Sequence, residues 1–434
     1  MRDLAVFGFM LVLVPLAFRH YFSAYLLWAW AGLISLNSYL YGFMMSVSYV
    51  QIFALICLGL LLLNKNKEKL TGTISPTSVL FVLVLVHGLL SATFAYPNLY
   101  QNWELYTNMV KTLLFCLLMP LIVTSRFRLH MLFLVLGLAL GFHGVLDGLK
   151  FLASGGSHLA SGIAKFGDNN HYAMVLVMAL PMIFYLYRYT NGRLLKFGFL
   201  ASGVLVSLAV VSTNSRGGLL SLMVVALFLL LYGKRKIAAL FTISLMATLL
   251  FFLAPDQWFN RMATIQSAEQ DSSFMGRVTA WKRASAIAVE HPVLGGGYHA
   301  GQAPSIFNEF RYKQGLLGFV DTPNVGYPAA THSIYFEVLG DLGFVGLFLF
   351  VTCLTNVYFL FKKILNIPQP QTMAQVWARD MAMALMAAMV AYMVGGAALS
   401  AAYFELPYIL MMMMQTLHLI VLRQAPVKPK PRLI

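Results

Sequence analysis

The chain has 434 residues, of which 60% are hydrophobic and only 10% are charged, and its formal net charge is +15. A typical globular chain has about 25% charged residues, so this composition excludes an ordinary soluble protein, a soluble nucleic-acid binder and a disordered chain. Because Cys57, Cys116 and Cys353 all lie in apolar runs, a disulfide framework and a cysteine-based metal site are excluded as well.

Long apolar runs predict membrane-spanning helices along most of the chain. A bilayer span needs roughly 20 apolar residues, and unpaired backbone groups cannot face lipid, so helices are the expected form. The runs lie at 4–18, 22–36, 44–64, 77–95, 104–124, 128–152, 171–188, 196–213, 217–232, 237–254, 333–361, 381–400 and 404–422. The predicted fold class is an all-α polytopic integral membrane protein.

The number of spans depends on the first two runs. Residues 4–18 and 22–36 are each short for a crossing, and Arg19 and His20 separate them. We expect either that one of them does not fully span or that they share one crossing. The working prediction is about 12 transmembrane helices, with both ends of the chain in the cytoplasm.

The basic residues collect in alternate loops. The larger set consists of Lys65, Lys67, Lys69, Arg126, Arg128, Arg188, Arg193, Lys196, Lys234, Arg235, Lys236, Lys362, Lys363, Arg423, Lys428, Lys430 and Arg432. The short loops between them hold only Lys165 and Arg216. Positively charged loops stay in the cytoplasm, so the surplus of positive charge is a topology signal and does not imply a polyanionic partner.

This orientation divides the chain into four parts. We predict transmembrane helices at 1–254, a large and partly helical periplasmic loop at 255–331, further transmembrane helices at 332–424 and a cytoplasmic tail at 425–434. A long structured loop in a compact protein is usually functional, so the loop and the turns beside it are where we look for chemistry.

The first motif is a pair of asparagines, Asn169 and Asn170, before the run at 171–188. They are candidates for substrate binding. Earlier in the chain, His143, Asp147 and Lys150 have the spacing of neighbours on one helix face. Ionisable residues inside a membrane are functional candidates, but an internally paired structural cluster explains this group equally well.

The second motif is the turn Asn214-Ser215-Arg216-Gly217-Gly218, which joins two apolar runs at the outer face. An arginine here departs from the charge rule. It either snorkels to the interface or forms a fixed clamp for phosphate oxygens, because a guanidinium stays charged and offers a planar fork. We predict that Arg216 binds a diphosphate, with Ser215 as a further contact.

The third motif lies in the large loop, where residues 276–290 predict an amphipathic helix. Arg277 would lie in its first turn, a position that the helix dipole makes unfavourable for a cation unless an anion binds there. Trp281 either anchors the helix at the membrane interface or contacts substrate. Arg283 is a candidate substrate contact, although a solvated face is the simpler interpretation for Lys282 and Arg283.

The fourth motif opens the span at 333–361, with Thr331 as the expected helix cap. His332 would lie in the first turn, where the helix dipole lowers the pKa of imidazole and favours a neutral general base. A structural histidine is the alternative. Gly340, Gly343 and Gly346 follow at a spacing that lets another helix approach closely.

With these motifs in this order, the chain resembles the bacterial O-antigen ligase superfamily, which also contains O-antigen polymerases and protein O-oligosaccharyltransferases. The resemblance covers 160–350 best, on Asp168-Asn169-Asn170, Ser215-Arg216-Gly217, Gly276-Arg277, Trp281, His291-Pro292, Gly295, Gly297 and the His332 helix. Family members usually show His-Asn and then an acid before the glycines. Here Ser333 stands in the Asn place and Asp341 in the acid place.

The resemblance implies a GT-C-like glycosyltransferase of the bacterial inner membrane. It would move a glycan from undecaprenyl diphosphate to lipid A-core oligosaccharide at the periplasmic face, where no ATP is available. Arg216 and Arg277 would hold the diphosphate in place of a metal, since no cluster suits one, and no cofactor is expected. His332 would accept the proton of the acceptor hydroxyl in a single inverting displacement. The expected partners are the donor, the acceptor and membrane lipids, with no nucleic acid.

Three other functions remain open. A Wzy-type polysaccharide polymerase and a protein O-oligosaccharyltransferase would share this chemistry and differ only in the acceptor. A transporter of lipid-linked glycans would instead need a polar site near the middle of the membrane. The unusual polar residues collect at the outer face, which favours an enzyme.

Overall fold

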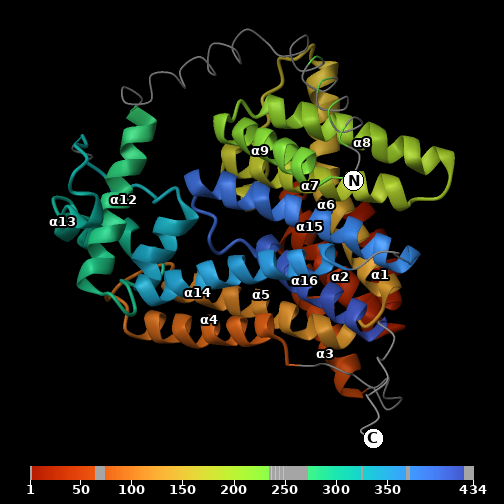
Figure 1. The fold of residues 1–434 in the computed structure, drawn as a ribbon, viewed down its shortest axis with the longest axis horizontal. Helices are drawn as coiled ribbons and strands as arrows, with labels where there is room; N and C mark the ends of the chain where they lie inside the picture. Colours follow the sequence, from red (N-terminus) through yellow and green to blue (C-terminus); the bar gives the residue numbers. More distant parts are fainter. Residues whose placement is uncertain are drawn as a thin grey trace, which may run out of the picture.

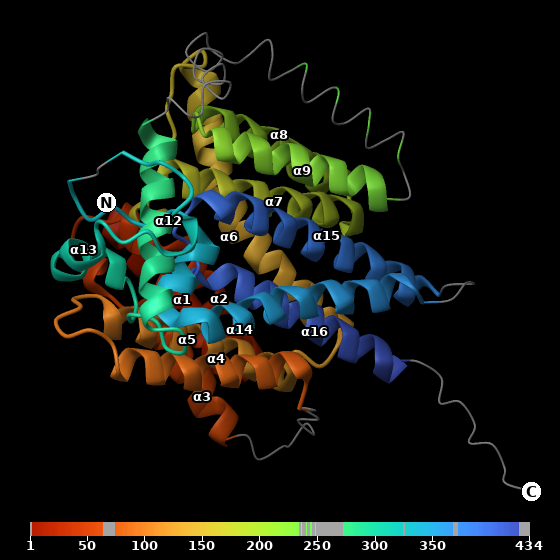
Figure 2. The same cartoon turned by 60° about the vertical axis from the view of Figure 1, so that its left-hand side comes forward.

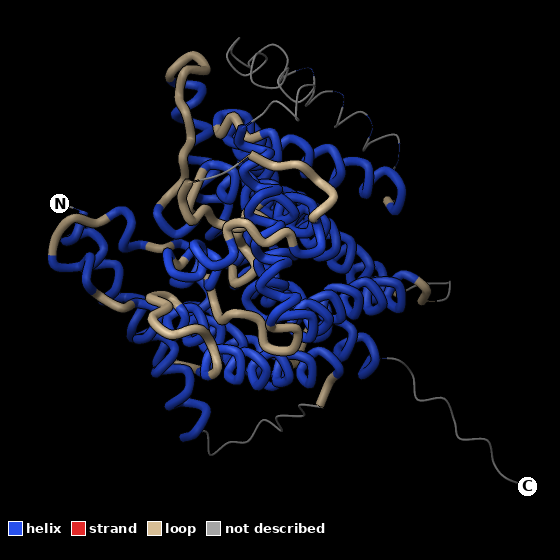
Figure 3. The backbone as a smooth tube through the Cα atoms, turned by 90° about the vertical axis from the view of Figure 1, so that its left-hand side faces the viewer, coloured by secondary structure: helices blue, strands red, loops and turns tan. Residues whose placement is uncertain are grey.

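The computed structural model describes residues 2–63, 74–233, 272–323, 326–367 and 372–424, together with the single positions 236, 240, 244 and 248. In this part of the chain the regular elements are α-helices and short 3-10 helices, without a strand (Figure 3). The predicted all-α fold class is confirmed. Most of the expected span at 237–254 lies outside the described residues, and so do all of the loop residues 255–271 and the tail 425–434. Several of the predicted cytoplasmic basic residues also lie outside them: Lys65, Lys67, Lys69, Lys234, Arg235, Lys428, Lys430 and Arg432.

The helices follow the predicted runs closely in the first half of the chain. They are α1 (Arg2–Phe18), α2 (Tyr21–Ile34), α3 (Tyr49–Leu63), α4 (Pro76–Thr93), α5 (Asn102–Ile122), α6 (Arg126–Ala153), α7 (Asn169–Tyr189), α8 (Arg193–Ser212) and α9 (Arg216–Tyr232). After the part that is not described come α12 (Ser272–Glu290), α13 (Pro304–Phe310), α14 (Ile334–Leu365), α15 (Met373–Gly395) and α16 (Glu405–Gln424).

Eight of these helices are long and apolar enough to cross a membrane: α4, α5, α6, α7, α8, α14, α15 and α16. Three shorter apolar helices, α2, α3 and α9, accompany them. The chain is therefore an all-α polytopic membrane protein, while the total of about 12 spans stays a prediction. The first two apolar runs form separate helices, α1 and α2.

The helix α15 begins eight residues before the predicted run at 381–400. Thr372 and Gln375 form a capping box, in which the Thr372 hydroxyl accepts from the Gln375 N–H at 3.3 Å and the Gln375 amide oxygen accepts from the Thr372 N–H at 2.8 Å. Capping boxes start helices, and this Thr-x-x-Gln signal is readable from the sequence. The polar first turns of α15 hid it from a search for apolar runs.

The long helices run along the molecule, and α12 crosses one end of them. Figures 1 and 2 show α4, α5 and α14 lying roughly parallel, with α12 and α13 at one end of the bundle. Helix α12 packs against the start of α14, where a Cβ at Gly340 would lie 3.0 Å from the Cβ of Ala284. We call this end of the bundle the α12 end.

Two basic residues from loops that the sequence predicts to be cytoplasmic have partners near the start of α15. Arg188, at the end of α7, pairs with Asp380 near the start of α15 at 3.0 Å. Arg126, at the start of α6, lies 4.9 Å from the ring of Trp377 in α15. At the α12 end, the predicted exception Lys165 pairs with Glu405 at the start of α16.

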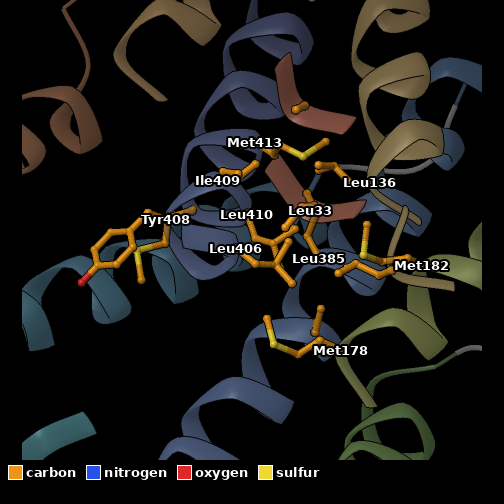
Figure 4. Close-up of a cluster of buried hydrophobic side chains, with 14 of the residues drawn as sticks. Leu33, Leu136, Met178, Met182, Leu385, Leu406, Tyr408, Ile409, Leu410 and Met413 are labelled. Atoms are coloured by element: carbon orange, nitrogen blue, oxygen red, sulfur yellow. The ribbon is translucent and has the colours of Figure 1, made fainter. Parts of the chain in front are cut away.

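The core surrounds α16. Figure 4 shows side chains of α16 meeting those of α2, α6, α7 and α15 in one apolar cluster, which includes Leu33, Leu136, Met178, Met182, Leu385, Leu410 and Met413. The run Met411–Met414 is fully buried. Because interiors are closely packed, this core fixes the positions of the helix ends that carry polar residues at the α12 end.

Candidate active site

The start of α7 is held by its own cap. Asp168 is the N-cap residue, and its carboxylate accepts from the N–H groups of Asn170 at 2.9 Å and His171 at 2.8 Å. The Asn169 amide donates to the Thr213 carbonyl at 2.8 Å. The two predicted asparagines therefore lie against the turn between α8 and α9.

That turn has Asn214 in the left-handed region at φ 53°, while Gly217 and Gly218 already belong to the first turn of α9. The Ser215 hydroxyl accepts from the Gly218 N–H at 3.0 Å, which caps α9, and donates to the Asn170 amide oxygen at 2.8 Å. Arg216 is the first residue of α9 and is half-buried. A guanidinium at a helix N-terminus, where the helix dipole is positive, favours an anion.

In the large loop, the predicted helix exists as α12 but begins earlier than expected. Because α12 starts at Ser272, Arg277 lies in its second turn, so the prediction that it occupies the first turn is wrong. Val278, Ala284 and Ile287 of the predicted apolar face are buried, but every residue from 282 to 288 is buried as well, so burial is not confined to one face of α12. Trp281 is packed rather than free in the interface, stacking on Phe336 of α14 at 5.2 Å.

Lys282 and Arg283 do not form a solvated face, contrary to the simpler sequence interpretation. The Lys282 ammonium donates to the Gln314 amide oxygen at 2.8 Å, and only 7% of the residue is exposed. The Arg283 guanidinium lies 5.2 Å from the Phe307 ring and donates to the Ala329 carbonyl. Burial lowers the pKa of Arg283 to about 10. The loop folds back over α12 and buries both side chains.

His332 precedes helix α14 and does not lie in it. The helix starts at Ile334 with Ser333 in the cap position, so the predictions of a Thr331 cap and of a histidine in the first turn are wrong. The backbone of His332 is left-handed at φ 47°, and its N–H donates to the Ser400 hydroxyl at 2.8 Å. Trp281 donates its indole N–H to the Thr331 carbonyl at 2.8 Å. These contacts use the backbone groups that a helix start would need.

The pKa of His332 is lowered from its ordinary value, as predicted, but for other reasons. Burial is the largest cause and the positive charge of Arg277 is the second, while Asp168 and Glu337 oppose them. A neutral imidazole at neutral pH follows, which is the form that a general base requires. Arg277, Asp168 and Glu337 all act on His332, so α12, α7 and α14 meet around it.

Two further groups, Glu337 and His299, were not singled out from the sequence. Glu337 is 2% exposed, and its carboxylate accepts from His299 Nε2 at 3.0 Å and from the Ala402 N–H at 2.9 Å. His299 Nδ1 also lies 2.8 Å from the Gln101 amide oxygen. An acid inside an apolar run is the signal that could have identified Glu337.

The glycines of α14 have different roles. Gly340 admits α12, as predicted, but Gly343 breaks the helix with φ 70° and ψ −171°. The segment after α12 docks at this break, where the Phe344 N–H donates to the Pro292 carbonyl at 2.8 Å and the Gly297 N–H donates to the Asp341 carbonyl at 3.0 Å. This docking brings His299 to Glu337.

The remaining polar groups have structural partners. Asp147 accepts from Lys150 and His158, each at 3.0 Å, and from the Tyr172 hydroxyl at 2.8 Å. His143 instead contacts the Tyr39 hydroxyl at 2.5 Å. The internally paired interpretation of Asp147 and Lys150 therefore fits. Among the described residues, no group of three or more His, Cys, Asp or Glu side chains is arranged to hold a metal.

The structure thus gathers the predicted residues at the α12 end in two groups. One joins Asn169, Asn170, Ser215 and Arg216 at the starts of α7 and α9. The other joins Arg277, Trp281, Arg283 and the segment that ends at His332. Asp168 connects them, because it caps α7 and acts electrostatically on His332.

Two family models match the chain. Residues 1–191 match a family of unknown function (DUF5935), and residues 201–351 match the family described as O-Antigen ligase. No curated protein matches significantly. The second match spans Arg216, Arg277, His332 and the buried Glu337. The match at residues 201–351 supports the resemblance of this part of the chain to the O-antigen ligase superfamily.

Proposed function

We propose that the protein is an O-antigen ligase that transfers a glycan from undecaprenyl diphosphate to lipid A-core oligosaccharide at the periplasmic face of the bacterial inner membrane. One observation carries the proposal. Arg216 opens α9 and Arg277 acts on His332 at the same end of a membrane bundle, within the matched domain. Two guanidinium groups and a neutral imidazole suit a reaction with a diphosphate leaving group and a hydroxyl nucleophile.

In this proposal the two arginines hold the donor. As the bond between the anomeric carbon and the phosphate oxygen breaks, negative charge grows on the departing diphosphate. Arg216 and Arg277 stabilise this charge, and the N–H groups at the start of α9 add to their effect. Apolar surfaces between the helices receive the polyprenyl chain.

His332 activates the acceptor. Its imidazole takes the proton of the acceptor hydroxyl while the oxygen forms a bond to the anomeric carbon. The leaving diphosphate departs from the opposite face, so this single displacement inverts the anomeric configuration. The lowered pKa of His332 supports the role, because a neutral ring can accept a proton at neutral pH.

For five other predicted site residues we propose positioning roles, since each has a partner in the protein. The amides of Asn169 and Asn170 and the hydroxyl of Ser215 hold the turn that presents Arg216. Trp281 and Arg283 hold the carbonyls of Thr331 and Ala329, which lie just before His332.

The decisive experiment offers one lipid-linked donor to three acceptors. The acceptors are lipid A-core, a second carrier-linked glycan and a protein with Ser or Thr sites, each with purified protein in detergent or vesicles. Extension of lipid A-core supports the ligase proposal. Extension of the carrier-linked glycan or of the protein would make the enzyme a polymerase or a protein O-oligosaccharyltransferase. Donor translocation without extension of any acceptor would indicate a transporter.

The proposed reaction uses no metal, and this is tested separately. The same assay is run with EDTA and then with added Mg²⁺. Transfer should be the same in all three conditions. Loss of transfer with EDTA and recovery with Mg²⁺ would contradict the metal-independent step while leaving the family assignment untouched.

A further inference from the structure

Behind His332 lies a buried carboxylate with charged neighbours from several elements. Glu337 is on the first turn of α14, and both of its carboxylate oxygens are used, one by His299 Nε2 at 3.0 Å and one by the Ala402 N–H at 2.9 Å. Its charge also acts on His332 and on His171 of α7. One carboxylate therefore serves three imidazoles.

The contacts of Glu337 tie together segments that are far apart in the sequence. His299 lies in the connection after α12, and Ala402 lies in the connection between α15 and α16. The second connection also contains Ser400, whose hydroxyl accepts from the His332 N–H at 2.8 Å. Ser400 thus holds the backbone N–H of His332, and Glu337 holds the backbone N–H of Ala402, two residues after Ser400.

The protonation of His299 fits this arrangement. Both ring nitrogens lie against oxygens, of Gln101 at 2.8 Å and of Glu337 at 3.0 Å, and an imidazolium can donate to both. Burial by itself lowers the pKa of His299, but the hydrogen bond to Glu337 and the charges of Asp341 and Glu337 outweigh it, so the pKa is raised. A positively charged His299, which is half-buried, then forms an ion pair with the buried Glu337 carboxylate.

We propose that Glu337 is a positioning residue and counter-charge for His332: it fixes the backbone beside His332 and stabilises the imidazolium that forms when His332 takes the acceptor proton, while His299 moderates its charge. This inference rests on the proposed role of His332 as the base. A buried ion pair adds little net stability in general, so retaining one beside a titrating group favours an electrostatic role.

The groups that face His332 determine the expected direction of each change. They are Arg277 of α12, which lowers its pKa, and Asp168 before α7 and Glu337 of α14, which raise it. Replacing Glu337 by glutamine removes a charge that raises the pKa of His332. That pKa then falls, and the acid limb of the kcat/KM profile, where His332 becomes protonated, moves to lower pH.

Replacing His299 by glutamine should change the pKa of His332 in the opposite direction. The amide N–H can donate the hydrogen bond to Glu337, but it carries no charge. The charge of Glu337 is then less compensated, the pKa of His332 rises, and the acid limb moves to higher pH. A purely structural role for either residue would not produce shifts of opposite direction.

Asp341 supplies a matched control on the same helix. It is also a buried acid, 4% exposed, and its carboxylate accepts from the Tyr403 hydroxyl at 2.9 Å, but it is not among the charges that act on His332. Asp341→Asn makes the same change from acid to amide about one turn away. Because Asp341 helps to raise the pKa of His299, this change can act on His332 only through His299, so any shift of the acid limb should be upward, opposite to that of Glu337→Gln.

The experiment measures transfer against pH for the unmodified protein, E337Q, H299Q, D341N and H332A, each checked for thermal unfolding in detergent. We expect E337Q to lower kcat about tenfold, because a tenfold loss corresponds to one pKa unit of electrostatic stabilisation of the His332 imidazolium. The donor KM should change little. The acid limb should move down in E337Q and up in H299Q, and D341N should not move it down.

Several results would overturn the inference. An unchanged acid limb in folded E337Q would do so, as would equal shifts in E337Q and D341N. If E337Q does not fold, H299Q decides alone, and an acid limb that stays or moves down contradicts the proposal. Transfer by H332A would instead remove the proposed base itself, so the two failures are distinguishable.

Discussion

Two helix starts at the α12 end carry the candidate chemistry, and they are built differently. At α9 the Ser215 hydroxyl caps the helix by accepting from the Gly218 N–H three residues later, and Arg216 is the first helical residue. At α14 Ser333 makes no side-chain cap, and His332 lies outside the helix with its N–H on Ser400, 68 residues away.

The two helix starts therefore differ in how the functional side chain is positioned. Contacts close in the sequence dominate at Arg216, which we call local control, and contacts distant in the sequence dominate at His332, which we call tertiary control. The cap of α9 lies within four residues of Arg216, and Asn169 and Asn170 of α7 hold the same turn, so a change in the connection between α15 and α16 should leave Arg216 in place. His332 has a left-handed backbone that only its surroundings stabilise, because a non-glycine residue is disfavoured there by sterics. Changes in the connection between α15 and α16 should therefore reach His332 and not Arg216.

The largest expected effect comes from removing a side chain itself. Arg216→Ala should lower transfer by about 10²–10³, the loss typical of removing one electrostatic donor at a developing charge. Arg277→Ala and His332→Ala should have effects at least as large. The measurement is the initial rate of glycan transfer by protein that unfolds at the temperature of the unmodified chain.

Arg216→Lys is the matched control for that change. It keeps the charge but loses the planar fork, so its transfer rate should lie between those of the unmodified protein and Arg216→Ala. Near-normal transfer by folded Arg216→Ala would remove this residue from the site and leave α14 as the only helix start with a role.

A smaller effect is expected from Ser400→Ala, which tests tertiary control directly. It takes away the acceptor of the His332 N–H and leaves a half-buried donor without its partner. We expect kcat to fall about tenfold, a cost of about 1–2 kcal/mol, while the donor KM changes little because Arg216 stays in place. An increased donor KM with unchanged kcat would contradict this division.

The same contrast explains how much of the site could be predicted from the sequence. The Ser215–Gly218 turn and the Asp168 cap are encoded within four residues, and both form as their residue types indicate. The position of His332 depends on Ser400 and Trp281, which no local pattern connects to it. The expected Thr331 cap was wrong because those two contacts occupy the backbone around it.

Fold class and burial show a similar division. Apolar runs predict the helices because membrane spans must bury their backbone groups within themselves, whatever they pack against. The burial of Lys282 and Arg283 depends instead on the loop that covers α12, through Gln314 and Ala329. The pair of Glu337 and His299 forms only because the segment after α12 docks at the break in α14 at Gly343.

Ser215→Ala should have a smaller effect, on stability. It removes the cap of α9 and the hydrogen bond to Asn170, and loss of a helix cap typically costs about 1 kcal/mol. Thermal unfolding in detergent should show a modest decrease, with the acid limb of activity unchanged because His332 is not touched. A shifted acid limb would mean that the two helix starts are coupled more tightly than their contacts indicate.

The last prediction concerns the pH at which the activity of the unmodified protein declines on the acid side. This pH tells whether the protonation of His332 or that of His299 reduces activity. Burial and Arg277 lower the pKa of His332, whereas the pKa of His299 is raised. If His332 is the base, kcat/KM should hold as the pH falls through the ordinary histidine value of about 6.5 and decline only below it. A decline that begins above that value would match His299 instead. Activity would then require His299 in its neutral form, and the general base would have to be sought elsewhere than at the start of α14.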